Sequence, residues 1–211
     1  MKFFTDLESI RERWNVLEHP FYTRWSAGEL TQEELASYSG QYRQAVVALA
    51  QASTATAAAA GDEGLRRSLG AHAAEETAHI DLWDRFTAAI GGDTADAPTP
   101  ETVACADVWS QDRPLLESLV AMYAIESGQP AISETKRAGL VEHYGAEPGS
   151  DTTLYFDLHA VRDVEHAAYE RALIEPLLDG ADVDALLAEA EAVLKANWEL
   201  LDGVERLNGR C

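Results

Sequence analysis

The stretch HAVRDVEH, residues 159–166, places two histidines seven positions apart with an aspartate between them. Upstream, HAAEETAH at 72–79 repeats the pattern of histidine, three residues, an acid, two residues and histidine. These two segments hold four of the six histidines in the chain. Because each helical residue turns its side chain by about 100°, the three polar side chains of each segment share one narrow stripe when the segment is helical. The two stretches therefore predict two helices whose polar stripes contribute to one site.

Helical patterns also dominate the rest of the sequence, without a series of strands, a GxGxxG turn or a P-loop. TQEE at 31–34 has the form of a capping box, and the proline in HPFY at 19–22 is expected to break the preceding helix. The sequence predicts an all-α bundle of six or seven helices in a single domain, residues 1–211. The expected helices cover residues 5–18, 31–60, 65–90, 101–109, 112–144, 152–178 and 182–207.

The composition narrows the classes of partner. A formal net charge of −21 repels phosphate backbones and anionic lipids, so neither nucleic acid nor a membrane is an expected partner. The charged N-terminal stretch lacks the apolar core of a signal peptide, and no apolar run approaches the ~20 residues of a membrane span. A cytoplasmic location is therefore expected. Cys105 and Cys211 lie in neither a CxxC nor a Cys/His spacing, which argues against a disulfide scaffold or a zinc ribbon.

The two polar stripes have the composition of a metal site. Neutral imidazole and carboxylate together suit first-row metals such as iron, manganese and zinc. In helical bundles, dimetal carboxylate sites are assembled from inward-facing Glu and His on several helices, often with a Glu-x-x-His pair. The expected ligands are His159, Asp163 and His166 on one helix, and Glu76 and His79 on the other.

Three further acidic or imidazole side chains accompany these ligands. Glu126 lies in the apolar context AMYAIESGQPAI, where a carboxylate is costly unless it is paired or metal-bound, so it is the natural completing ligand. Glu75 lies directly beside the stripe of its helix, and the choice between Glu75 and Glu76 stays open. His72 is either a further ligand or a group that supports the ligands.

Simpler explanations account for single residues but not for the whole pattern. A lone histidine on an amphipathic helix is usually structural, which is the expectation for His19 beside Pro20 and for His143 near a helix end. A His/Asp pair at i, i+4 can merely stabilise a helix. Two triplets of equal spacing together with Glu126 favour a metal site. Nucleophilic catalysis has little support, because the chain has no GxSxG elbow and no suitably placed cysteine.

With these residues in place, the whole chain resembles the heme-oxygenase-like dimetal oxidases, which share a fold with thiaminase II and the pyrroloquinoline-quinone synthase. The most specific stretches are HPFYTRWSAGELTQEEL, HIDLWDRF, YAIESGQPAISETKRAGL and YFDLHAVRDVEHAAYERALIEPLL. The resemblance implies a heme-oxygenase-like helical bundle, a homodimer, and two non-heme metal ions (Fe/Fe or Mn/Fe) that use O2 as co-substrate with an external reductant. The implied metal ligands are Glu76, His79, Glu126, His159, Asp163 and His166.

Within that family the chain is most similar to the branch that forms para-aminobenzoate, to which the chlamydial protein associating with death domains belongs. This resemblance implies that Tyr22 is sacrificed as the ring source, that Tyr38 lies near the site, and that Lys136 is the amino donor. One alternative is the same dimetal site acting on an external small molecule, such as an amino acid or a fatty acid. Others are a metal-free enzyme of the thiaminase II or quinone-cofactor synthase type, and a binding protein that keeps the bundle without turnover.

Overall fold

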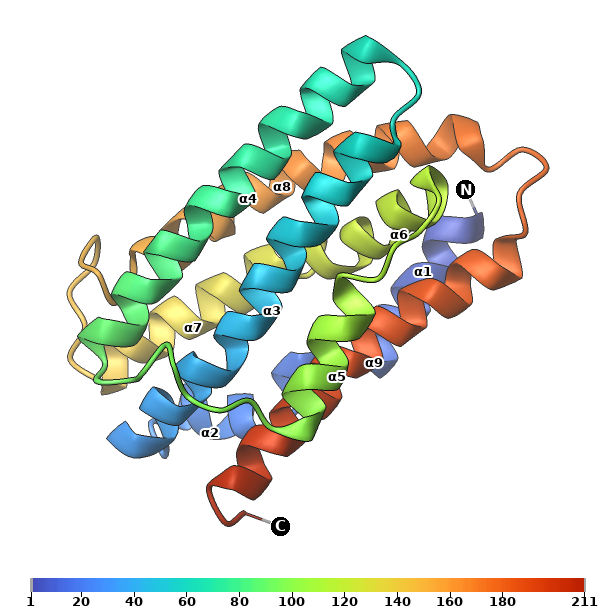
Figure 1. Ribbon diagram of the computed structural model, residues 1–211. Coiled ribbons are helices and arrows are strands. Elements are labelled where there is room, and N and C mark those ends of the chain that lie inside the picture. Colours follow the sequence, from blue (N-terminus) through green and yellow to red (C-terminus); the bar gives the residue numbers. More distant parts are fainter. Residues whose placement is uncertain (1, 211) are drawn as a thin grey trace.

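The computed structural model of the protein describes residues 2–210, and all regular elements in that range are helices (Figure 1). Met1 and Cys211 lie outside the described residues. The prediction of an all-α bundle is confirmed, and most helices agree with their expected ranges. The expected number of six or seven is too low, because the described residues form nine α-helices. The α-helices of the described part are α1 (Lys2–Arg13), α2 (Pro20–Ala27), α3 (Gln32–Ala59), α4 (Glu63–Ala89), α5 (Pro100–Trp109), α6 (Leu115–Glu126), α7 (Gln129–His143), α8 (Leu154–Ile174) and α9 (Val183–Leu207).

The long helices run along the bundle and enclose one apolar core. Figure 1 shows α3 and α4 side by side, joined by a short turn, with α8 behind α4 and with α9 on the opposite side next to α5 and α1. Helices α6 and α7 lie between these groups, because α6 packs on α8 and α9 and α7 packs on α8. The core includes Phe86, Phe156 and Leu200, none of which is exposed. This arrangement brings α4, α6 and α8 together around a common interior.

Capping residues in the sequence set where the helices begin. The Thr31 hydroxyl accepts a hydrogen bond from the Glu34 backbone N–H, and the Glu34 carboxylate accepts one from the Thr31 N–H, so the predicted capping box is confirmed. The Asp62 carboxylate accepts a hydrogen bond from the Leu65 N–H and caps α4. The capped start of α4 precedes the polar stripe of that helix by about three turns.

The predicted helix 112–144 is wrong as a single element, because α6 ends at Glu126 and α7 begins at Gln129. Pro130 explains the break, since proline has no N–H to donate and its ring opposes the carbonyl four residues earlier, here that of Glu126. The break leaves Glu126 at the C-terminal end of α6. It also places Lys136 on the following helix rather than on the same one.

The segment HPFY not only ends a helical region but also starts a helix, α2, which the sequence analysis did not predict. His19 caps α2, because its Nδ1 accepts a hydrogen bond from the Phe21 N–H at 3.1 Å, and Pro20 fits the first helical turn. His19 Nε2 also lies 3.2 Å from Asp202 Oδ1, so the expected structural role of this histidine is confirmed. Helix α2 carries Tyr22 into the core.

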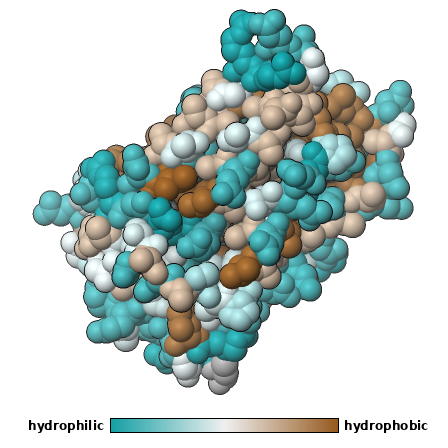
Figure 2. All heavy atoms as spheres, viewed as in Figure 1, coloured by the Kyte–Doolittle hydropathy of each residue, from teal (hydrophilic) through white to brown (hydrophobic). Residues whose placement is uncertain are grey.

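The surface agrees with the acidic composition. Figure 2 shows one face covered mainly by hydrophilic residues, with hydrophobic residues scattered among them. Among residues 2–210, no helix combines the length and the apolar character that crossing a membrane requires.

Candidate metal centre

Eight ionisable side chains from three helices meet in the interior of the bundle, and we call this group the metal centre. Helices α4 and α8 contribute their polar stripes, and α6 contributes its last residue. Each of the eight residues is at most 7% exposed. The metal centre consists of His72, Glu76 and His79 from α4, Glu126 from α6, and His159, Asp163, His166 and Glu170 from α8.

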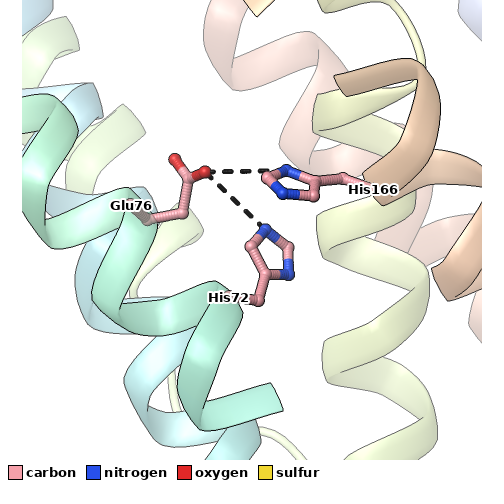
Figure 3. Close-up of side chains that lie close together, drawn as sticks. All are labelled: His72, Glu76 and His166. Atoms are coloured by element: carbon pink, nitrogen blue, oxygen red, sulfur yellow. Dashed lines mark ion pairs between the residues drawn. The ribbon is translucent and has the colours of Figure 1, made fainter. Parts of the chain in front are cut away.

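The donor atoms of the metal centre lie at the spacing of ligands around an ion. Glu76 Oε1 is 3.2 Å from His79 Nδ1 and 3.7 Å from both His72 Nε2 and His166 Nδ1. Figure 3 shows His72 and Glu76 of α4 facing His166 of α8. Glu126 Oε1 lies 3.3 Å from His72 Nε2, and Glu126 Oε2 lies 3.4 Å from His166 Nδ1. Most of these separations exceed a normal hydrogen bond. They match two ligands of one ion, which lie about 3.0–3.5 Å apart when each bond is ~2.1 Å.

Four overlapping groups of three residues have ligand atoms within 4.8 Å of one another. Neighbouring groups share His72, Glu76, Glu126 or His166, so the groups form one continuous centre rather than separate sites. Such an arrangement is typical of a site for two ions that lie side by side in a helical bundle. The groups are His72–Glu76–His166, Glu76–His79–His159, His72–Glu126–Glu170 and Glu126–Asp163–His166.

Every residue of the metal centre has at least one buried donor or acceptor atom without a hydrogen-bond partner among the described residues. A buried polar atom without a partner is costly, and a buried carboxylate without a partner is more costly still. An ion of positive charge would satisfy these atoms together. The residues therefore fit a metal centre, and the unpartnered atoms include both oxygens of Glu126, Asp163 and Glu170, Nε2 of His159 and both ring nitrogens of His72.

His159 is held in the orientation of a metal-binding histidine. Its Nδ1 lies 2.8 Å from the Tyr155 carbonyl oxygen and donates to it, which leaves Nε2 free to face the centre. The Tyr155 ring stacks on the imidazole with ring centroids 3.9 Å apart. Burial lowers the pKa of His159 to about 4, so the imidazole is neutral, the state in which it binds metals.

The remaining pKa shifts describe a centre rich in negative charge. Burial raises the pKa of Asp163 to about 7, and the neighbouring Glu126 and Glu76 carboxylates act in the same direction. Burial alone would lower the pKa of His72 and His166, but nearby carboxylates outweigh it and raise both values to about 10. Protons on these histidines hold the positive charge that a metal would otherwise supply.

The structure separates the two adjacent glutamates of α4. Glu76 points into the metal centre, whereas both oxygens of Glu75 accept hydrogen bonds of 2.7 Å from the Arg162 guanidinium at the surface. The Glu75–Arg162 pair lines a surface hollow of about 240 Å³ whose floor includes His72 and His166. This hollow is where the metal centre approaches solvent.

A second buried region surrounds Lys136 on α7, and we call the rings around it the aromatic cage. The Lys136 Nζ is 4.4 Å from the Tyr42 ring centroid and 5.2 Å from that of Tyr22. Among the described residues, no carboxylate forms an ion pair with Nζ. Burial lowers the pKa of Lys136 to about 7, so the amine is largely unprotonated just above neutral pH. The cage consists of Tyr22, Tyr38, Tyr42, Trp83 and Phe156.

Tyr22 and Tyr38, the two tyrosines singled out by the sequence, are brought together. Their hydroxyl oxygens are 2.8 Å apart and share a hydrogen bond in the core. Burial raises the pKa of both phenols well above the ordinary value, so both stay neutral. With Lys136 beside them, the three residues form one site.

Aromatic rings in contact join the aromatic cage to the metal centre. The Tyr22 and Tyr38 centroids are 6.2 Å apart, and Tyr38 lies 6.0 Å from Trp83. Trp83 lies 4.8 Å from Tyr155, whose ring stacks on His159. The two regions are therefore linked by continuous packing.

Comparison with known proteins places the chain in a family. The profile of a family described as "Iron-containing redox enzyme" matches residues 36–198, which include the whole metal centre and most of the aromatic cage. The chain belongs to this family. The expected relationship to heme-oxygenase-like oxidoreductases is thereby confirmed, and this member of the iron-containing redox enzymes is an oxidoreductase.

Curated relatives of this redox enzyme share one name, "4-aminobenzoate synthase". The protein of Chlamydia trachomatis is 34% identical over 96% of this chain and 91% of its own length. The protein of Chlamydia muridarum is 33% identical over 96% of this chain and 89% of its own, and that of Nitrosomonas europaea is 30% identical.

Solved structures show the same fold. A TenA homologue from Pseudomonas syringae superposes with a TM-score of 0.80 at 19% identity, over 97% of this chain and 91% of its own. A domain from Shewanella denitrificans described as having a heme oxygenase-like fold gives a TM-score of 0.79 at 20% identity, over 96% of this chain and 91% of its own. The predicted heme-oxygenase-like bundle is confirmed.

One member of the metal centre, Glu170, was missed by the sequence analysis. It follows His166 by four positions and therefore lies on the same stripe of α8 as His159 and Asp163. The spacing alone was sufficient to indicate it, but the repeated pattern of the two stretches ends at the second histidine.

Proposed function

We propose that this redox enzyme is an O2-dependent oxidase with two non-heme metal ions, Fe/Fe or Mn/Fe, in the metal centre. The observation that carries the proposal is the set of buried, unpartnered donor atoms at ligand spacing. When bound, the metals would activate dioxygen as the oxidant, with electrons from an external reductant. The proposed ligands are Glu76, His79, Glu126, His159, Asp163 and His166. His72 lies beside them, whereas Glu75 pairs with Arg162.

Residues around the metal centre support the proposed ligands. The Tyr155 carbonyl fixes the tautomer of His159, so that one nitrogen is always available to a metal. The Glu75–Arg162 pair lines the surface hollow together with His166. Burial of the carboxylates makes them bind a cation more strongly than exposed carboxylates would.

We further propose that the oxidised group is internal, with Tyr22 as the ring source of 4-aminobenzoate and Lys136 as the nitrogen source. The name shared by the curated relatives supports this, as does the position of the amine against the Tyr22 ring. A nitrogen must have a free electron pair to bond to carbon, and burial gives Lys136 that state near neutral pH. The reaction breaks the Tyr22 Cα–Cβ bond and the Lys136 Cε–Nζ bond, and it joins Nζ to the ring carbon that loses its hydroxyl group as water. Cβ is oxidised to the carboxylate, with dioxygen as the oxidant and an external reductant supplying the remaining electrons for its reduction to water.

The aromatic side chains have distinct roles in this proposal. Tyr38 shares a hydrogen bond with Tyr22 and holds the orientation of its phenol. Trp83 and Tyr155 continue the ring contacts away from Tyr38, so an electron from Tyr22 has a path through oxidisable rings. Burial of all four rings excludes water from this path.

Mass spectrometry of the intact chain tests the proposal. Protein made with isotopically labelled tyrosine and heavy-nitrogen lysine is loaded anaerobically with Fe(II) or with Mn(II) and Fe(II), and is then exposed to O2 and a reductant. Loss of side-chain mass at Tyr22, with both labels in released 4-aminobenzoate, is the expected result. Tyr169→Phe, which changes a tyrosine outside the cage, should retain the product, whereas Tyr22→Phe should abolish it.

The same experiment separates the alternatives. Bound metal with an unmodified chain would contradict the use of Tyr22 and would favour an external small molecule, such as an amino acid or a fatty acid. Absence of metal binding would contradict the dimetal oxidase and would favour a metal-free relative. A thiol-dependent reaction has no support in the described residues, because Cys105 is completely buried and burial raises the pKa of its thiol.

A further inference from the structure

Glu170 continues the stripe of α8 by one more turn, beyond the residues that the sequence pattern marked. With 100° per residue, it projects within about 40° of His159, Asp163 and His166. The side chain is not exposed at all, and neither carboxylate oxygen has a hydrogen-bond partner among the described residues. No arginine or lysine forms an ion pair with it there. A buried carboxylate in this position lacks the compensation that such groups normally have.

The residues around Glu170 indicate what could satisfy its buried carboxylate. One of its oxygens lies within 4.8 Å of a His72 nitrogen and a Glu126 oxygen, which are themselves 3.3 Å apart. These three donors come from α8, α4 and α6, so they surround a common point from three helices. His72 has both ring nitrogens unpartnered, and Glu126 has both oxygens unpartnered. Three buried, unpartnered donors of this kind are typical ligands of a first-row metal.

The total charge of the metal centre also favours Glu170 as a metal ligand. Two divalent ions bring four positive charges, and the metal centre has four carboxylates, those of Glu76, Glu126, Asp163 and Glu170. With all four ionised, the loaded centre is neutral. Without Glu170 a net positive charge would remain in a region of low dielectric, where it is unfavourable.

We propose that Glu170 is a metal ligand and that, with His72 and Glu126, it forms one of the two metal positions of this enzyme. The metal centre then has four histidines and four carboxylates. This inference rests on the proposed function, because it assumes that the centre binds two ions. It assigns a ligand role to His72, whose function the sequence left open.

Metal analysis of variants tests the inference. Wild-type protein and Glu170→Gln are loaded anaerobically with Fe(II), freed of excess metal and analysed for bound iron per chain. Gln keeps the size of the side chain but removes its charge, so we expect bound iron to fall from about two to about one per chain. Glu165→Gln is the matched control, because Glu165 lies on the same helix but is exposed, and it should keep both ions.

His72→Gln and the double variant His72→Gln/Glu170→Gln sharpen the test. If both residues bind the same ion, the double variant should lose no more iron than either single variant, since that position is already empty. Loss of both ions in the double variant alone would contradict a shared position.

Folding is controlled with Glu170→Leu, measured without metal by circular dichroism and thermal unfolding. Leu removes a buried polar group, so the metal-free variant should unfold at a temperature equal to or above that of the wild type while binding less iron. A metal-free Glu170→Leu protein that is unfolded would show that the fold itself requires Glu170, which overturns the inference. Two ions in both the wild type and Glu170→Gln would overturn it while leaving the proposed function intact, whereas no iron in the wild type would overturn the proposed function itself.

Discussion

Eight ionisable side chains meet in the metal centre, whereas the aromatic cage holds a single amine, that of Lys136. Both regions are buried in the same core, and in both regions burial disfavours the charged form of an ionisable group, Asp163 in the metal centre and Lys136 in the cage. In the metal centre four carboxylates lie beside four histidines, so a cation can satisfy them together. In the cage the amine is alone among rings, so it loses its proton instead. The difference shows how one core can favour both a bound cation and an unprotonated amine.

The break between α6 and α7 adds to the contrast between the metal centre and the aromatic cage. Glu126 is the last residue of α6, where the partial negative charge of the helix end disfavours a second negative charge. Pro130 creates that helix end and also begins the helix that carries Lys136. One local break therefore gives the metal centre an acid that needs a cation, and gives the aromatic cage its amine.

The largest expected effect is the loss of both metals from the double variant His159→Ala/His166→Ala. His159 belongs to the group with Glu76 and His79, and His166 belongs to two other groups. His166 also adjoins His72 and Glu126 of the fourth group, so the two changes reach every part of the centre. Bound iron, measured by elemental analysis, should fall from about two per chain to nearly none. His143→Ala is the control, because this histidine contacts the Ser26 carbonyl at the surface, and it should keep both ions. If the double variant kept two ions per chain, His159 and His166 would not be metal ligands, and the contrast between the metal centre and the aromatic cage would be wrong.

A smaller but more selective effect is expected at the two adjacent glutamates of α4. Glu76→Gln removes an oxygen that two ligand groups share, and it should lose at least one ion. Glu75→Gln breaks the surface pair with Arg162 and should keep both ions, with binding weaker by about tenfold at most. Titration with Fe(II) under anaerobic conditions distinguishes the two variants. If Glu75→Gln lost more iron than Glu76→Gln, Glu75 rather than Glu76 would be the metal ligand.

The metal centre was largely predictable from the sequence because its pattern is local. His159, Asp163 and His166 share a stripe on any regular helix, whatever the rest of the chain does. Glu126 was found by a different argument, namely the cost of an acid among apolar neighbours. Glu170 obeys the same helix geometry and was missed only because the repeated pattern stops at His166.

The aromatic cage was not predictable from spacing, because its rings come from four different helices and Lys136 comes from a fifth. Tyr22 lies on α2, Trp83 on α4, Phe156 on α8 and Lys136 on α7, and only tertiary packing brings them together. The sequence suggested Tyr22 and Lys136 through a family resemblance rather than through geometry. The helix break at Pro130 was visible in principle, but the strong helical pattern on both sides concealed it.

The pH dependence of stability tests the cage. Lys136 has an ordinary pKa of 10.5 in the unfolded chain and about 7 in the fold, so between these pH values the unfolded chain binds more protons. Lys136 therefore contributes a free energy of unfolding that rises with pH over this range, whereas His72 and His166, whose pKa values are raised, contribute in the opposite direction. The difference between Lys136→Met and the wild type isolates the contribution of Lys136. Lys136→Met removes the buried amine and should be more stable than the wild type by up to about 4 kcal/mol at pH 7, with little advantage near pH 10.

Urea unfolding of the metal-free proteins at the two pH values measures this difference. Lys195→Met is the matched control, because Lys195 is exposed, and its effect should be small and nearly the same at both pH values. An advantage of Lys136→Met that stays constant between pH 7 and pH 10 would contradict the lowered pKa. The cage would then hold the amine by packing alone, and its contrast with the metal centre would be weaker.

The smallest expected effect concerns the hydrogen bond between the two caged tyrosines. Tyr38→Phe leaves the buried Tyr22 hydroxyl without its partner, which should lower the free energy of unfolding by roughly 1–3 kcal/mol. Tyr169→Phe, which loses an exposed hydrogen bond to Ser68, should cost less. Both variants should keep their full metal content, because neither side chain reaches the centre. If Tyr38→Phe also lost metal, the ring contacts through Trp83 would couple the two regions energetically, and the metal centre and the aromatic cage would have to be treated as a single site.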